Sequence, residues 1–168
     1  MRSCGFIAPP GPPPGQEFAE AVLWAGDIVA ETAPVRMNTV LGSCVAVCLY
    51  DAALRFGGMN HYLVPRGGQA AIHGDWSIPS LVGRLESLGS SPRRLQAKVF
   101  GGGSPLRLAN DELAVGAGNV AIAHEVLGHF GIPIVAERVR HTGGMRLYFE
   151  NWTGTVWVHR HETGENHE

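Results

Sequence analysis

Hydrophobic and polar positions follow two different periods along residues 17–159, and the changes of period predict both strands and helices. The segment CVAVCLY, residues 44–50, is apolar throughout and rich in β-branched side chains, which favours a strand covered on both faces. MNHYLV, residues 59–64, is typical of a second strand, and Gly57-Gly58 predicts the turn before it. Two apolar strands so close in sequence predict an antiparallel hairpin with a long loop.

Two segments have the spacing of amphipathic helices. In SIPSLVGRLESL, residues 77–88, apolar side chains recur every three or four positions, and either Asp75 or Ser77 is a suitable N-cap. In NVAIAHEVLGHF, residues 119–130, the apolar side chains again lie on one face, and Asn119 is a candidate cap. Each segment is long enough for about three helical turns.

The remaining pattern completes an α/β domain. Residues 17–24 fit either the start of a short helix or the approach to a strand. Short runs rich in β-branched or aromatic residues predict further strands at residues 97–100, 132–138, 145–150 and 155–159. Strands that carry two helices, without an internal repeat, predict one α/β domain.

Length and composition set the limits of this domain. Of 168 residues, 45% are hydrophobic and 17% charged, which is enough apolar surface for one core. Residues 1–16 hold five prolines and predict an extended, disordered leader, and residues 160–168 predict a flexible tail. The remainder, residues 17–159, is the expected folded unit. A formal net charge of -2 without a basic block argues against nucleic-acid binding and against binding to anionic membranes.

The chain carries the signs of a cytoplasmic protein. No apolar run approaches the roughly 20 residues of a membrane helix, so we expect no membrane insertion. The amino terminus lacks the apolar stretch of about 7–15 residues that a secretory signal requires. Three cysteines, Cys4, Cys44 and Cys48, form no disulfide pattern and fit a reducing compartment.

Candidate chemistry is concentrated where a Gly-Ser turn meets the first apolar strand. Gly42 and Ser43 precede Cys44 there, and such a turn exposes backbone N–H groups that have no ladder partner. These donors are suited to an oxyanion that forms when a thiolate attacks an amide carbonyl, and Gly42 lets substrate approach closely. The same donors favour the thiolate, so we expect a lowered pKa at Cys44.

A nucleophilic thiol needs a base within hydrogen-bond reach, and His61 is the best candidate because its strand is predicted to pair beside the Cys44 strand. The residues alone leave alternatives open. A free cysteine in an apolar strand is often a small core residue, and this is the preferred interpretation of Cys48. For Cys44 the structural and catalytic interpretations are about equally supported, and His61 alone favours a hydrogen-bonded core histidine.

Metal and phosphate sites are weaker competitors. On a strand, Cys44 and Cys48 are separated by about 13 Å, too far to ligate one zinc ion. Gly101-Gly102-Gly103 is not followed by the Lys-Ser/Thr of a phosphate loop. We therefore expect no metal and no organic cofactor.

Seven segments in order resemble the chemoreceptor glutamine deamidases, the CheD family of bacterial chemotaxis, over about residues 20–159. They are LGSCVAVCLYD (41–51), GGMNHYLVP (57–65), AKVFGGGSPL (97–106), VGAGNV (115–120), GIPIVAE (131–137), GG-R-LYFE (143–150) and TGTVWV (153–158). The chain departs from the family pattern in VGAGNV and in the third glycine of GGGSPL.

The resemblance implies a layered α/β sandwich with a mixed sheet, similar to cysteine deamidase toxins. It implies hydrolysis of glutamine side chains in methyl-accepting chemotaxis receptors, with Cys44 as nucleophile and His61 as base. A threonine near the nucleophile supports this pair in the family, which implies the role for Thr39, with Asn38 at the neighbouring position as the alternative. It also implies a CheC-type phosphatase as a possible partner.

Two other functions compete with deamidation. In one, the chain is a regulatory module that binds a phosphatase or a receptor while its Cys–His pair is silent. In the other, the same pair hydrolyses receptor glutamate methyl esters, since methoxide can leave by the same route as ammonia.

Overall fold

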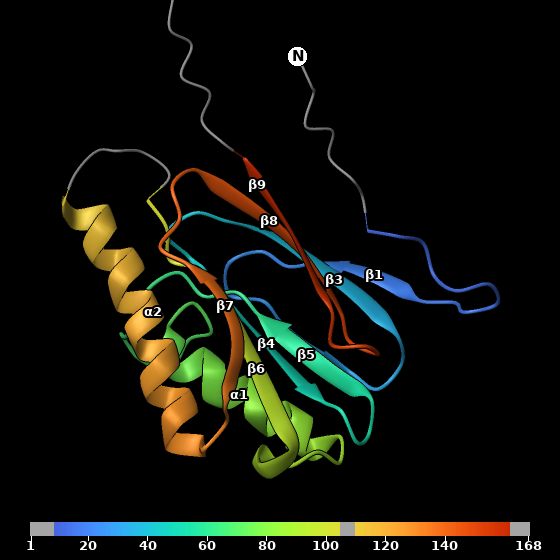
Figure 1. The fold of residues 1–168 in the computed structure, drawn as a ribbon. Coiled ribbons are helices and arrows are strands. Elements are labelled where there is room, and N and C mark those ends of the chain that lie inside the picture. Colours follow the sequence, from blue (N-terminus) through green and yellow to red (C-terminus); the bar gives the residue numbers. More distant parts are fainter. Residues whose placement is uncertain (1–8, 105–109, 162–168) are drawn as a thin grey trace, which may run out of the picture.

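Within residues 9–104 and 110–161, which the computed structural model describes, two β-sheets and two α-helices form three layers (Figure 1). The outer sheet has the strand order β1-β3-β8-β9, with bounds Ala19–Val22, Val35–Leu41, Gly144–Glu150 and Val156–His161. The central sheet has the order β2-β5-β4-β6-β7, with bounds Ile28–Glu31, Phe56–Asn60, Val45–Asp51, Leu95–Gly101 and Ile134–Val139.

The helices cover one face of the central sheet, and the outer sheet covers the other. They are α1 (Gly74–Ser87) and α2 (Asn110–Phe130), with a short 3-10 turn, η1, at Pro92–Arg94. Both sheets are mixed, because β1 pairs with β3 and β6 with β7 in parallel while the other pairs are antiparallel. This arrangement confirms the expected single-domain layered α/β sandwich.

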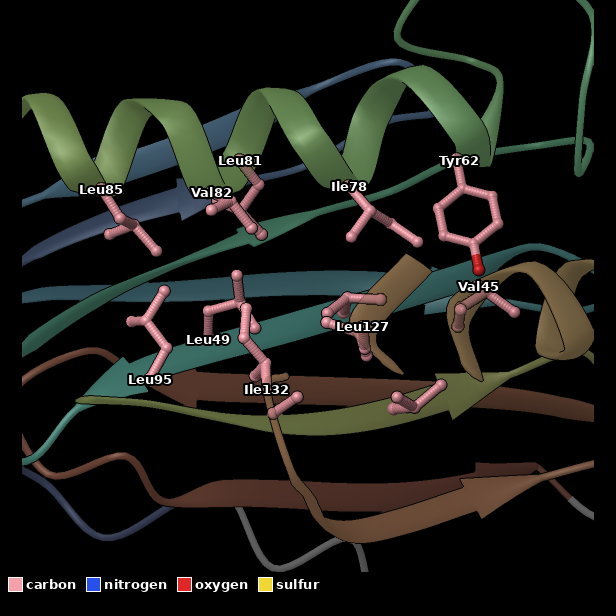
Figure 2. Packing of buried hydrophobic residues seen from close by; sticks show 14 of the residues in the cluster. Val45, Leu49, Tyr62, Ile78, Leu81, Val82, Leu85, Leu95, Leu127 and Ile132 are labelled. Atoms are coloured by element: carbon pink, nitrogen blue, oxygen red, sulfur yellow. The ribbon is translucent and has the colours of Figure 1, made fainter. Parts of the chain in front are cut away.

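Strand β4 shows why its sequence is apolar at nearly every position. Successive side chains of a strand point to opposite faces, so Val45, Val47 and Leu49 pack toward the helices. Figure 2 shows Val45 and Leu49 on the side of the central sheet that α1 covers. Ala46 and Cys48 belong instead to the core between the two sheets. Each face therefore contacts a different layer, as the unbroken run 44–50 predicts.

The β4–β5 hairpin is antiparallel as predicted, but its turn is not at the glycine pair, and β5 ends at Asn60, so His61 follows the strand instead of lying in its middle. The turn occupies residues 52–55, and Gly57 and Gly58 lie buried inside β5. A Cβ at Gly57 would stand 2.1 Å from the Leu49 carbonyl oxygen, and one at Gly58 would stand 2.6 Å from that of Val29. The glycines are present because neighbouring backbones pass too closely for a side chain, not because the chain reverses there.

Asp51 closes this turn with a fully buried carboxylate. One oxygen accepts the amides of Ala53 and Leu54, each at 3.0 Å, and the other accepts Ser90 Oγ at 2.6 Å and Arg94 Nε at 3.0 Å. Burial by itself raises the pKa of Asp51, but these hydrogen bonds and the charge of Arg94 outweigh it and lower the pKa. The hairpin is thereby tied to the segment between α1 and β6.

Replacing Asp51 with alanine is expected to lower the free energy of unfolding by about 2–4 kcal/mol, since buried donors lose a charged acceptor. Because the folded pKa is lowered, this stabilisation is present above the unfolded pKa of about 3.9 and is lost as the pH falls. Urea unfolding at several pH values measures both effects. The matched control is Glu86→Ala on the exposed side of α1, which should change stability by less than about 0.5 kcal/mol.

Both predicted helices form, but they begin earlier than predicted. His73 occupies the N-cap of α1, so Asp75 and Ser77 lie inside the helix and neither is its cap. Helix α2 begins at Asn110, which places Asn119 in mid-helix rather than at a cap. The glycines before Asn119 have low helix propensity and suggest a break. Close packing of Gly116 against the Gly102 backbone overrides that preference.

The hydrophobic pattern predicts no strand at two places where the structure has one. Strand β2 forms the edge of the central sheet, and β3 lies inside the outer sheet between β1 and β8. Residues 17–24, open between helix and strand in the sequence, contain strand β1. Strand β3 carries Thr39.

Candidate active site

Thr39 reaches from the outer sheet to an imidazole of the central sheet. Its side chain is buried, and its Oγ1 donates to the Leu23 carbonyl at 2.7 Å. The same oxygen lies 2.8 Å from Nδ1 of His61. A hydroxyl has one proton, and here the Leu23 carbonyl accepts it, so Oγ1 must accept the hydrogen bond from Nδ1–H. This contact therefore sets the neutral tautomer of His61 with a bare Nε2.

The backbone of His61 is held on both sides by the turn after β1. Its amide donates to the Asp27 carbonyl at 3.1 Å, and its carbonyl accepts the amide of Gly26 at 2.8 Å. The residue is only 6% exposed, and Nε2 is buried without a hydrogen-bond partner among the described residues. An unprotonated, unpaired imidazole nitrogen in this position is suited to accept a proton from a nucleophile.

Cys44 and His61 lie on the same face of the central sheet. The regular β4–β5 pairing, with Cys48 opposite Met59, continues in the same register to Val45 opposite Tyr62. Val45 and Tyr62 exchange both backbone hydrogen bonds, at 3.1 and 3.0 Å. Side chains alternate in direction along each segment. Since Val45 and Tyr62 point toward the helices, Cys44 and His61 point toward the outer sheet, diagonally opposite each other across the ladder. The thiol of Cys44 is half-buried, so it stays open to an approaching substrate.

The turn before β4 is held by its carbonyl groups. The Gly103 amide donates to the Gly42 carbonyl at 2.9 Å, and the Gly102 amide donates to the Cys44 carbonyl at 2.8 Å. Gly102 has φ 63°, and a Cβ there would stand 2.4 Å from the Val120 side chain. The glycine triplet is thus a backbone clamp on the Cys44 turn. Among the described residues, we find no backbone acceptor for the amides of Ser43 and Cys44 in this turn.

The ionisation of Cys44 is opposite to the sequence prediction. Burial raises its pKa, and the nearby Cys44 amide, which lowers the pKa, does not compensate. Burial also lowers the pKa of His61, more than the Leu23 carbonyl and the Asp27 charge raise it. The expected lowered thiol pKa is therefore wrong, because no cationic imidazole stands beside the half-enclosed sulfur. The resting pair is a thiol and a neutral imidazole.

This resting state predicts a specific pH dependence. Activity is expected to hold as the pH falls to about 6.5 and to decline only below it, because burial keeps His61 in its basic form. At neutral pH the thiolate absorbance of the wild type should equal that of Cys44→Ser. A thiolate signal at neutral pH that disappears in this variant would show a preformed thiolate–imidazolium pair and contradict the prediction.

The other candidates of the sequence take structural positions. Cys48 is 1% exposed in the core between the sheets, and burial raises its pKa far above the usual range. Cys48 lies inside β4, whereas Cys44 directly precedes the first residue of that strand. Within residues 9–104 and 110–161 no group of three or more His, Cys, Asp or Glu side chains is placed to hold a metal ion. In the same ranges, no helix is both long and apolar enough to span a bilayer.

Asn119 is the site residue that pattern reasoning assigned wrongly. Its side-chain amide is fully buried and donates to the Ser43 carbonyl at 2.9 Å and to the Leu63 carbonyl at 3.0 Å. Ser43 immediately precedes Cys44, and Leu63 follows His61 with Tyr62 between them. A buried asparagine in the middle of a helix is itself a signal for such a contact, because asparagine is a poor helix former.

Comparison with known proteins identifies the family. Residues 65–160 match the family model CheD, described as CheD chemotactic sensory transduction. A Sulfurimonas denitrificans protein named probable chemoreceptor glutamine deamidase CheD is 36% identical over 147 residues, covering 84% of this chain and 94% of that protein. A Rhodospirillum rubrum protein of the same name is 40% identical over 139 residues, covering 81% and 79%. The chain belongs to the CheD family.

Proposed function

We propose that this chain hydrolyses the side-chain amide of glutamines in chemoreceptors, releasing ammonia and leaving glutamate. The relatives carry the name of that activity. The family match begins after Cys44 and His61, so their roles rest on geometry. The observation that carries the proposal is the His61 imidazole, whose Nδ1 is fixed by Thr39 while Nε2 stays free on the face of the sheet that Cys44 shares.

The first half-reaction forms a thioester. Nε2 of His61 takes the proton of the Cys44 thiol as sulfur attacks the glutamine carbonyl carbon. The carbonyl oxygen becomes an oxyanion, which the amides of Ser43 and Cys44 stabilise, with Gly42 leaving room for the substrate. The imidazolium gives its proton to the amide nitrogen, the carbon–nitrogen bond breaks, and ammonia leaves. Thr39 holds the imidazole in orientation throughout.

The second half-reaction restores the enzyme. His61, neutral again, removes a proton from water as the water oxygen attacks the thioester carbon. The tetrahedral intermediate collapses, the carbon–sulfur bond breaks, and sulfur recovers the proton from the imidazolium. The product is a glutamate carboxyl group. The sequence of steps needs no metal and no organic cofactor. A free nucleophilic thiol requires reducing conditions, so we place the reaction in the cytoplasm.

Exposed apolar side chains around His61 support a protein substrate rather than a free amino acid. Trp24 is 73% exposed on the turn whose Gly26 bonds the His61 carbonyl. Ile72 and Leu63 are also exposed, share a backbone hydrogen bond, and adjoin that turn, since a Cβ at Gly26 would stand 3.2 Å from Ile72. Adjacent apolar side chains beside a reactive group favour a macromolecular surface.

Incubation with the cytoplasmic fragment of a chemoreceptor tests the proposal. We expect ammonia release, together with the mass increase that replaces a glutamine NH2 by OH, located by peptide mass spectrometry. Free glutamine should react far more slowly. Absence of modified glutamine in fragments that bind the chain would overturn the proposal and favour the silent binding module. A fragment carrying methylated glutamates, assayed for methanol, separates esterase activity. Binding of a CheC-type phosphatase stays a prediction.

A further inference from the structure

Asn119 connects the two segments that carry the reacting side chains. The side chain is 0% exposed, and both of its donated hydrogen bonds end on main-chain carbonyls, those of Ser43 and Leu63. Its orientation is determined, because exchanging nitrogen and oxygen would point Oδ1 at two acceptors. The Asn119 carbonyl in turn accepts Tyr62 Oη at 2.5 Å. Asn119 on α2 is thus hydrogen-bonded both to the turn that carries Cys44 and to the segment that follows His61.

Small residues of α2 bring Asn119 within reach of this turn. A Cβ at Gly116 would stand 2.6 Å from the Gly102 carbonyl oxygen, and one at Gly118 would stand 3.0 Å from Pro65. Glycine is required at position 116 because the opposing atom is backbone, and glycine at position 118 leaves room for the Pro65 side chain. The VGAG stretch is therefore the packing surface that lets a short amide side chain contact main-chain carbonyls of two other segments.

The Ser43 carbonyl that Asn119 binds shares a peptide group with the Cys44 amide. In a trans peptide the C=O and N–H bonds point in opposite directions, and no cis peptide is found in the described residues. Fixing the Ser43 carbonyl toward α2 therefore turns the Cys44 N–H away from α2. That N–H lies close enough to the Cys44 sulfur to lower its pKa. The donor is consequently directed to the place where an attacked carbonyl would sit.

We propose that Asn119 is a positioning residue that aims the Cys44 amide at the oxyanion of the acyl-transfer step. The proposal rests on the function proposed above and adds the group that sets its oxyanion donor. The second hydrogen bond, to Leu63, holds the His61 strand beside the turn where ladder pairing has been reduced to the single pair Val45–Tyr62. The Asn119 amide bridges the two segments beyond that pair.

Two reagents that modify the same sulfur test this role. Acylation of Cys44 by p-nitrophenyl acetate passes through an oxyanion, whereas alkylation by iodoacetamide displaces iodide without one. In Asn119→Ala we expect acylation to slow by about 10²-fold, the usual effect of losing one oxyanion donor, whereas alkylation, which senses only the effect of the Cys44 amide on the thiol pKa, should slow far less. Mass spectrometry of the Cys44 peptide measures both rates. On receptor fragments kcat should fall by the same factor with KM unchanged.

Asn151 provides the matched control. It is also fully buried, and its amide likewise donates to two carbonyls, those of Glu31 and Ala33, on segments away from Cys44. Asn151→Ala should lower stability but leave both Cys44 rates unchanged. Equal loss of acylation and alkylation in Asn119→Ala, or loss of neither, would overturn the proposal. Acylation by p-nitrophenyl acetate needs no receptor. If Asn119→Ala selectively slows acylation while the wild-type chain fails to deamidate receptors, only the proposed function is refuted.

Asn119→Asp keeps the inference testable if the alanine variant does not fold. An ionised carboxylate faces two carbonyls and cannot hold the Ser43 peptide, whereas the protonated acid can donate one hydrogen bond. Acylation relative to the wild type is therefore expected to recover as the pH falls. A relative acylation rate that stays constant with pH would contradict the proposal, as would recovery of alkylation in parallel.

Discussion

Replacing Cys44 or His61 with alanine is expected to lower receptor deamidation by roughly 10⁴- to 10⁶-fold, and replacing both should cost little more than either alone. The physical reason is that the two side chains act as one unit. The half-buried thiol has a raised pKa and needs the imidazole to take its proton, while the imidazole without sulfur has no nucleophile to activate. Ammonia release from a receptor fragment by the three variants measures the effect.

Cys48→Ala is the matched control, because this thiol lies four residues after Cys44, inside β4, and belongs to the inter-sheet core against which Cys44 packs. It should cost about 1 kcal/mol of stability for the smaller side chain and leave kcat unchanged in the folded protein. Multiplicative losses in the Cys44/His61 double variant would show that the two side chains act independently. Retained deamidation in Cys44→Ala would disprove the nucleophile.

The antiparallel pairing of β4 with β5 could be predicted from the sequence because its signal is local. Residues 44–50 are apolar on both faces, and only a strand between two layers satisfies that pattern. The following apolar segment lies close enough to pair with it. The position of the turn could not be read in the same way, since Gly57-Gly58 has the composition of a turn. Its close backbone contacts exist only once three strands have assembled.

Thr39 and Asn119 depend on contacts between distant elements, so no local pattern reveals their partners. Strand β3 has inward-facing Met37, Thr39 and Leu41, and the polar threonine interrupts the apolar period that would have marked a buried strand. The raised pKa of Cys44 could not be predicted for a related reason. Turn amides are visible in the sequence, but how far two sheets enclose the sulfur is a property of the assembled layers.

Thr39→Val is expected to reduce kcat by roughly 10²- to 10⁴-fold, because valine keeps the shape of threonine but cannot accept a hydrogen bond. Nδ1–H of His61 then loses its acceptor, and the tautomer with a bare Nε2 is no longer favoured. Steady-state kinetics gives the rate loss. Imidazole 15N chemical shifts should show the Nδ1–H tautomer of His61 in the wild type and a mixture in the variant.

Two neighbouring substitutions make this result specific. Thr39→Ser keeps the hydroxyl and should retain most of the activity. Asn38→Ala removes a half-buried side chain whose amide, among the described residues, donates to the Ala21 carbonyl alone, at 3.5 Å, so it should leave kcat within about threefold. Full activity in Thr39→Val together with a large loss in Asn38→Ala would reverse the assignment, because a hydroxyl bonded to Nδ1 would then have no part in holding the base.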